Sequence, residues 1–185
     1  DKVNTPSDFG ASVGRYANRL DQGRITVNGE VIQLPQNNFG HCLHGGPEGW
    51  QYQVYSAEQK SDSVLVLTMD SPDGDSGFPG AVKAVVTMTV TSDNSIDIVY
   101  EAETDRTTVV NMTNHSYFNL SGDPSQPITD HVLYVDADTY TPVDDTYMTT
   151  GEIAEVEGTP MDFREAHEIG QDIRTFDFEQ VKFGN

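Results

Sequence analysis

The sequence predicts an all-β protein, built as an antiparallel β-sandwich or barrel, on three observations. Apolar and polar residues alternate with period two through most apolar segments, which is typical of strands with one buried face. Turn residues interrupt these segments at short intervals, as they do in antiparallel sheets. A helical period is confined to residues 164–174, which fit a short turn or helix. Because 185 residues suffice for one sizeable core, we expect a single domain over residues 1–185.

The strongest local signal is a hairpin near the N-terminus. Asn28-Gly29 separates two β-rich runs within residues 24–34, and a type I′ turn requires positive φ at both central residues. Two further strands are expected at residues 50–58 and 63–70. The first of these begins at Trp50, for which packing in the core and stacking on a sugar ring are both open.

The middle of the chain alternates most regularly. Residues 81–104 place apolar side chains on one face, pass through a Ser-Asp-Asn-Ser turn at 92–95, and resume the alternation at Ile96. This pattern predicts a second hairpin. Residues 107–118, 130–140 and 151–158 complete the expected strands.

The charge of the chain excludes two classes of partner. Ten basic and thirty acidic residues give a net charge of −20, which repels nucleic acid and anionic membrane surfaces. The acidic residues are scattered along the chain, so they are expected to solvate its surface. The sequence also lacks any apolar run of the ~18–20 residues that span a bilayer.

The compartment follows from weaker signals. A single cysteine, Cys42, cannot form an internal disulfide, which favours a reducing compartment and a cytoplasmic location. The N-terminus DKVNTPSDFG has neither the basic nor the apolar region of a signal peptide. A processed precursor would leave a periplasmic or secreted location open.

The segment NMTNHSYFNL, residues 111–120, carries unusual hydrogen-bonding capacity for a strand. As a strand it would place Val110, Met112 and Phe118 on the core side, and on the other face a polar row of four residues: Asn111, Thr113, His115 and Tyr117. Asn is depleted in strands because its side chain competes for backbone hydrogen bonds. The polar row therefore indicates fixed partners, either structural or a polar ligand.

A second candidate stretch is GHCLHGG, residues 40–46. His44 precedes Gly45-Gly46, which fits a side chain presented at a tight turn where the backbone closely approaches a neighbour. An ordinary turn with a solvated histidine is the alternative. Zinc is a poor fit, because His41, Cys42 and His44 lack the second ligand pair of a structural site.

Calcium is a poor fit at DGDSGFPG, residues 73–80. Counted from Asp73, the positions that need Gly and Glu in an EF-hand loop hold Phe78 and Ala84. A Gly/Pro turn between strands is the better interpretation.

Arginine supplies the remaining candidates, in GASVGRYANRLDQG at residues 10–23. Arg15 and Arg19 are two of ten basic residues in an acidic chain, and Asn18 precedes Arg19. A guanidinium is suited to bidentate hydrogen bonding with vicinal oxygens. The alternative is an ordinary ion pair with one of the many carboxylates.

Taken in order, these stretches resemble the galactose mutarotase (aldose 1-epimerase) family. The matching segments run from Phe9 to about Arg164 and include FGASVGRYANRL, LHGG, DGDSGFPG, NMTNHSYFNL and GTPMDFR. The resemblance implies a large antiparallel β-sandwich, the galactose mutarotase-like supersandwich. It also implies an isomerase that interconverts the α and β anomers of a free hexose, such as galactose or glucose, without a cofactor or metal.

The resemblance also implies roles for particular residues. His115 corresponds to the general acid that protonates the ring oxygen, while His44 and Arg19, with Asn18 beside it, correspond to residues that position the sugar. A histidine can donate and accept protons near neutral pH, and each such transfer is typically worth about 10²–10⁴ in rate. The negative net charge is expected to help keep His115 protonated.

Two departures from the family pattern qualify this expectation. The family's general base is a glutamate near the end of a longer domain, and neither Glu152 nor Glu179 lies in a motif that matches it. Before Leu43-His44, the family's usual Asn is missing from Gly40-His41-Cys42. The chain is thus expected to be a central part of the family domain, lacking both ends. A catalytically inert sugar-binding fragment is the alternative function, and a relative acting on a sugar phosphate is a further one.

Overall fold

The computed structural model describes residues 8–184 and divides the chain into two compact units. The first ends at Ser116 and the second begins at Tyr117. The prediction of one domain over residues 1–185 stays a prediction.

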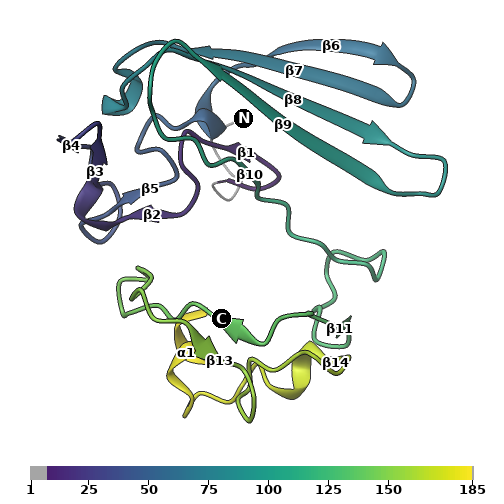
Figure 1. The fold of residues 1–185 in the computed structure, drawn as a ribbon. Coiled ribbons are helices and arrows are strands. Elements are labelled where there is room, and N and C mark those ends of the chain that lie inside the picture. The colour runs from purple at the N-terminus through teal and green to yellow at the C-terminus, as the bar shows by residue number, and fades with distance from the viewer. Residues whose placement is uncertain (1–7, 185) are drawn as a thin grey trace. The chain divides into compact units, whose positions relative to one another are not determined.

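The largest element of the first unit is a four-stranded antiparallel sheet, ordered β6-β7-β8-β9 (Figure 1). Its strands are β6 (Ser56–Ser61), β7 (Val64–Ser71), β8 (Val82–Val90) and β9 (Ile96–Thr104). The β8–β9 hairpin predicted from residues 81–104 is confirmed, with Val82 opposite Thr104 and Val90 opposite Ile96. The buried side chains of β8 are Val82, Ala84 and Val86, as the alternation predicts.

The predicted strand at 50–58 is wrong in its first half. Trp50–Tyr52 form a 3₁₀ turn, η2, and β6 begins only at Ser56. Tertiary packing overrides the strand pattern, because the Trp50 N–H donates to Gly14 O and its indole lies buried beside Met69 and Val82. Trp50 therefore packs in the core.

The N-terminal hairpin is confirmed. β3 (Arg24–Val27) pairs with β4 (Glu30–Gln33), and Asn28 and Gly29 have φ values of 52° and 83°, as a type I′ turn requires. The hairpin contributes Ile25 and Val27 to a core cluster that also contains Leu34, Cys42 and Phe78. The short turn η1 (Asp21–Gly23) directly precedes β3, and the short turn η3 (Asp75–Gly77) directly precedes Phe78 of this cluster.

Two small strand pairs complete the first unit. β1 (Ser12–Val13) pairs with β10 (Thr113–Asn114), and β2 (Arg19–Leu20) pairs with β5 (Cys42–Leu43). Both pairings are antiparallel, and each places segments far apart in the sequence side by side (Figure 1).

The strand predicted over 107–118 is mostly wrong. Only Thr113 and Asn114 are paired as β10, because their partner strand β1 is two residues long. After β10, the Ser116 N–H donates a hydrogen bond to the Asn114 side chain, which turns the chain away from a strand. The expected core face is also wrong at Val110 and Phe118, which are both exposed, whereas Met112 does pack against the core.

The second unit consists of short elements. β11 (Val132–Leu133) pairs with β14 (His167–Glu168), and β12 (Thr139–Tyr140) pairs with β13 (Ala154–Glu155). The strands expected at 130–140 and 151–158 are therefore present only as two-residue pieces. Residues 164–174 contain β14 and the 3₁₀ turn η4 (Ile169–Gln171), which is the short turn allowed by the sequence.

A short helix, α1 (Glu179–Gly184), lies outside every predicted element. Glu179 in its first turn and Lys182 in its last complement the helix dipole, and Val181 is buried. Six residues are too few for the helical period to stand out in the sequence. The all-β fold class is confirmed, because strands dominate the described residues and α1 is their one α-helix.

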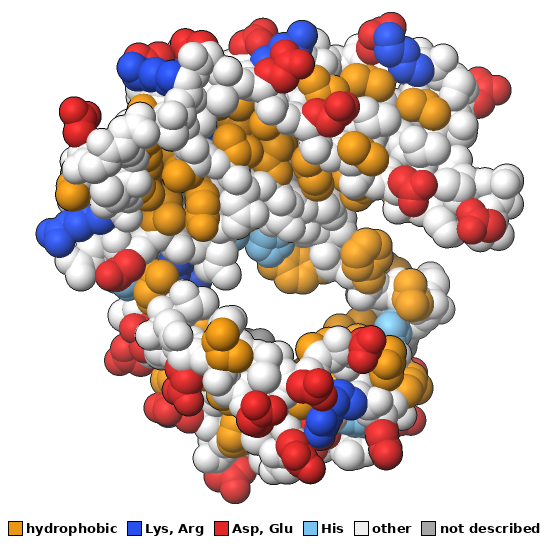
Figure 2. Space-filling view, in the orientation of Figure 1, with side chains coloured by type: hydrophobic (Ala, Val, Ile, Leu, Met, Phe, Trp, Pro, Cys, Tyr) orange, Lys and Arg blue, Asp and Glu red, His pale blue; other side chains and the backbone are white. Residues whose placement is uncertain are grey.

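The surface agrees with the sequence pattern. Acidic side chains are scattered over the visible face of each unit, interspersed with hydrophobic and uncharged groups (Figure 2). In residues 8–184, no helix combines the length and the apolar character needed to cross a membrane.

Candidate functional site

The four residues singled out by the sequence form one chain of contacts in the first unit. The rings of His115 and His44 meet edge to face, with centroids 5.3 Å apart and planes at 90°. His44 Nδ1 accepts a hydrogen bond from the Asn18 N–H at 2.9 Å. The Asn18 Oδ1 in turn accepts one from Arg19 Nη1 at 3.4 Å. Residues separated by almost a hundred positions in the sequence are thereby brought together.

Backbone pairing holds the two histidines at the ends of neighbouring strand pairs. His115 follows β10, and its N–H donates to Ala11 O at 2.9 Å while the Gly10 N–H donates back to His115 O at 3.1 Å. His44 follows β5, and its N–H donates to Asn18 O at 3.1 Å. The segment 10–20 therefore supports both rings.

His44 lies in a turn whose geometry the following glycine permits. His44 itself has φ of 53°, and Gly45 has φ of 79°. A Cβ on Gly45 would lie 2.3 Å from Gly14 O, so only glycine fits this close approach. The sequence signal LHGG thus has a steric cause, and the imidazole of His44 is half-buried and hydrogen-bonded.

The hydrogen bond to His44 fixes the tautomer of its neutral form. Because Nδ1 accepts the hydrogen bond from the Asn18 N–H, it carries no proton, and the ring proton of neutral His44 is carried by Nε2. Burial lowers the pKa of His44 below its usual value, and the charges of His115 and Arg19 lower it further, whereas the Asp8 carboxylate opposes them. Near neutral pH His44 is therefore a neutral hydrogen-bond donor through Nε2.

The Arg19 guanidinium is held in place by side-chain amides. Its Nε and Nη2 donate to Asn38 Oδ1 at 3.2 and 2.7 Å, and its Nη1 to Asn18 Oδ1. These two amide oxygens orient the planar guanidinium, which carries several N–H donors in a fixed geometry.

Sequence reasoning missed two residues of this neighbourhood. Asn38 orients Arg19, and its only signal was the Asn pair at 37–38 before the GHCLHGG stretch. The carboxylate of Asp8 raises the pKa of His44, against the effect of burial, and one of its oxygens is buried without a hydrogen-bond partner. No motif marked Asp8, because its contribution comes from spatial proximity alone.

The other sequence candidates serve different purposes. Arg15 is buried and points away into the core, where it bonds to Ser71 and to backbone carbonyls. Cys42 is buried too, and burial raises the pKa of its thiol to about 11. Within residues 8–184, no group of three or more His, Cys, Asp or Glu side chains is arranged to hold a metal ion.

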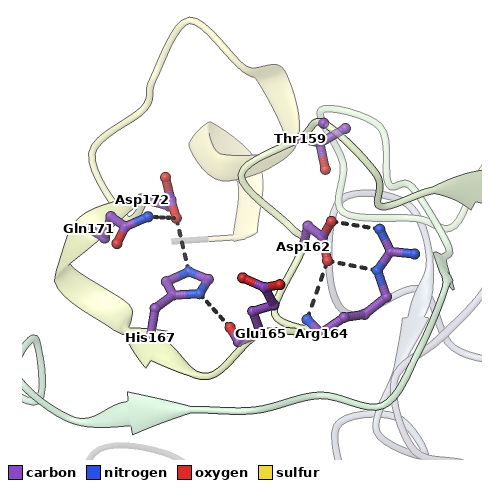
Figure 3. A pocket seen from close by; sticks show the side chains of 8 residues that line it. Thr159, Asp162, Arg164, Glu165, His167, Gln171 and Asp172 are labelled. Carbon is purple, nitrogen blue, oxygen red and sulfur yellow. Dashed lines mark hydrogen bonds and ion pairs between the residues drawn. The ribbon is translucent and has the colours of Figure 1, made fainter.

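The second unit contains a separate polar cavity of about 630 Å³ (Figure 3). His167 lines this cavity. Its Nε2 lies 3.0 Å from Asp172 Oδ2, its Nδ1 lies 2.8 Å from Glu165 O, and its ring stacks on that of Phe163. Arg164 is paired with Asp162, and His167 with Asp172, as the dashed lines in Figure 3 show. In particular, Arg164 holds the pKa of Asp162 at about 2. Because the Arg164 guanidinium and the His167 imidazole of this cavity are already paired with its aspartates, the histidine pair of the first unit is the better candidate site.

Comparison with known proteins gives consistent results. A family model described as Aldose 1-epimerase matches residues 1–184. Galactose mutarotase of Rattus norvegicus is 44% identical over 168 residues, which are 91% of this chain and 48% of the rat protein. Aldose 1-epimerase of Haemophilus influenzae is 40% identical over 177 residues, which are 95% of this chain and 52% of that protein.

A solved structure matches the fold. The crystal structure of galactose 1-epimerase from Lactobacillus acidophilus superposes with a TM-score of 0.88 at 32% identity, over 98% of this chain and 54% of the other. This likeness supports the β-sandwich class expected from the sequence. The chain spans about half the length of the relatives it matches.

Proposed function

Because the chain belongs to the aldose 1-epimerase family, we propose that it is the part of a mutarotase that carries the acid and the sugar-positioning residues. The reaction is the interconversion of α and β anomers of a free hexose such as galactose or glucose. The observation that supports this proposal is the edge-to-face pair of His44 and His115, joined through Asn18 to the Arg19 guanidinium.

The chemistry requires two proton transfers that balance each other. His115 gives a proton to the ring oxygen as the bond from that oxygen to C1 breaks, and a base removes the proton of the C1 hydroxyl, which leaves an aldehyde. Rotation about the C1–C2 bond then presents the other face of the carbonyl. Ring closure reverses both transfers and restores each group to its starting protonation state.

The other three residues position the sugar for these transfers. Neutral His44 donates a hydrogen bond from Nε2 to a sugar oxygen. This oxygen lies beside His115, because the centroids of the two imidazole rings are 5.3 Å apart. Arg19 binds hydroxyl oxygens through guanidinium hydrogens, and Asn18 completes this side of the site. Holding a substrate in reactive geometry is worth several kcal/mol of barrier, about 7–11 in well-oriented systems.

None of the four residues is assigned the role of the general base in this proposal. That gap, together with a chain spanning about half the length of its relatives, favours one second candidate function. In this alternative the chain binds a hexose without accelerating its mutarotation.

Polarimetry of freshly dissolved α-galactose distinguishes the two functions. We expect the chain to accelerate mutarotation over buffer and His115→Ala to remove most of that acceleration, by about 10²–10⁴ for one lost proton transfer. His167→Ala, in the cavity of the second unit, is the matched control and should retain the rate.

Three outcomes would count against the proposed mutarotation of a free hexose with His115 as the acid. A rate in His115→Ala equal to that of the unaltered chain would contradict the assignment of the acid. Binding of galactose without acceleration would establish the second function instead. Acceleration confined to a hexose 6-phosphate would point to the sugar phosphate as substrate.

A further inference from the structure

Arg15 is a buried arginine that the proposed reaction does not use. It is 1% exposed, and its guanidinium carbon lies 5.8 Å from the Trp50 ring centroid and 5.6 Å from that of Phe78. Its Nη1 donates to Pro79 O and Gly80 O, each at 2.9 Å, and its Nη2 donates to Ser71 Oγ at 2.5 Å. One side chain thus links segment 10–20 to the end of β7 and to the turn before β8.

A guanidinium is an unfavourable residue to bury for packing alone. Burial lowers the pKa of Arg15, and the carboxylates of Asp75, Asp73 and Asp105 counteract this without removing the desolvation. An apolar side chain of similar volume is often neutral or stabilising at such a position. The hydrogen bonds from its two Nη atoms supply a fixed geometry that an apolar residue would not, and such conformational specificity is attested for some buried charges.

The backbone beside Arg15 shows which geometry this is. Arg15 O accepts the Asn111 N–H at 2.9 Å, and the Ala17 N–H donates to Asn111 O at 2.8 Å. On one side of this contact, β1 pairs with β10, which leads to His115. On the other, Asn18 bonds to the imidazole of His44. Arg15 therefore anchors the segment on which both histidines depend, without contacting either ring.

We propose that Arg15 is a positioning residue for this site, whose side chain fixes segment 10–20 so that the rings of His44 and His115 keep their edge-to-face contact. The catalytic consequence rests on the proposed function, whereas the geometric one does not. Ser71 extends the anchor, because its hydroxyl donates to Asp75 Oδ2 at 2.5 Å while accepting from Arg15.

The test is an NMR measurement on the chain with isotopically labelled histidine, without any sugar. In Arg15→Lys we expect the nuclear Overhauser effect between the His44 and His115 rings to weaken by at least half. The ring nitrogen shifts of His44 should also lose the signature of an Nε2–H tautomer. Cross-strand contacts between β8 and β9 should persist. Arg24→Lys, at an exposed arginine of β3, is the matched control and should leave all these signals unchanged.

A second variant keeps the proposal testable if Arg15→Lys does not fold. Ser71→Ala leaves the arginine in place and removes one of its acceptors, so it should weaken the same ring contact to a smaller extent. An unchanged ring contact in a folded Arg15→Lys, or in Ser71→Ala where Arg15→Lys is unfolded, would overturn the positioning role.

Activity separates this result from the proposed function. If the unaltered chain accelerates mutarotation, kcat should fall in the folded variant by about 10²-fold, the scale of a 1 Å misplacement, with a smaller change in KM. An inactive unaltered chain in which Arg15→Lys still loses the ring contact would overturn the proposed function and support the positioning role.

Discussion

At the scale of single residues, the site depends on the protonation state of His44. Its Nδ1 is occupied by the Asn18 N–H, and burial lowers its pKa, so the neutral Nε2–H form is both geometrically and electrostatically preferred. Two independent observations thus support the same donor. His115, on the other side of the contact, is the residue to which we assign the acid.

This preference predicts how stability depends on pH. A histidine whose pKa is lower in the folded state binds fewer protons there than in the unfolded chain, so its neutral state favours folding at high pH. The contribution is complete above the ordinary value of 6.5 and is lost as the pH falls from 6.5 through the lower folded pKa.

We therefore expect the free energy of unfolding of the unaltered chain to fall more steeply below pH 6.5 than that of His44→Gln. Urea unfolding of both chains at a series of pH values measures this difference. Equal slopes would mean that His44 titrates alike in the folded and unfolded chains, against the burial that the structure shows.

At the scale of elements, the site is built where short strand pairs end in strained turns. Gly45 and Gly29 both have positive φ, at 79° and 83°, but their surroundings differ. A Cβ on Gly29 would meet open space, whereas one on Gly45 would collide with the backbone of Gly14. The two glycines therefore form a natural pair for comparison.

Gly29→Ala should destabilise the chain by roughly 1–2 kcal/mol, the cost of a left-handed conformation for a residue with a Cβ, and leave the histidine pair intact. Gly45→Ala should be more destabilising and should also displace the His44 ring from His115. Chemical denaturation gives the first quantity and histidine NMR the second. Equal effects of the two substitutions would show that the Gly45–Gly14 approach does not constrain the site.

At the scale of the whole molecule, the sequence predicted the regular sheet better than the irregular parts. The hairpins at 24–34 and 81–104 were predictable because alternation and turn chemistry are local. The departures at Trp50 and at Phe118 were not, since they arise from the contacts of Trp50 with Gly14 and of β10 with a two-residue partner. Local patterns cannot reveal such pairings between distant segments.

The candidate site divides in the same way. His44, His115, Asn18 and Arg19 were predictable from their motifs and residue types, and the structure joins them. Asn38 and the effect of Asp8 were not predictable, because each depends on which side chains lie near one another in space. The buried anchor formed by Arg15 was hidden for the same reason, as the acceptors Ser71, Pro79 and Gly80 lie between 56 and 65 positions away.

The most direct test of the account is a titration of the chain with galactose, followed through the ring signals of its five histidines. We predict shifts at His44 and His115 that saturate together, while His131 and His167 of the second unit stay unchanged. Shifts confined to His167, which lines the cavity of the second unit, would place sugar binding there and contradict the site proposed for the first unit.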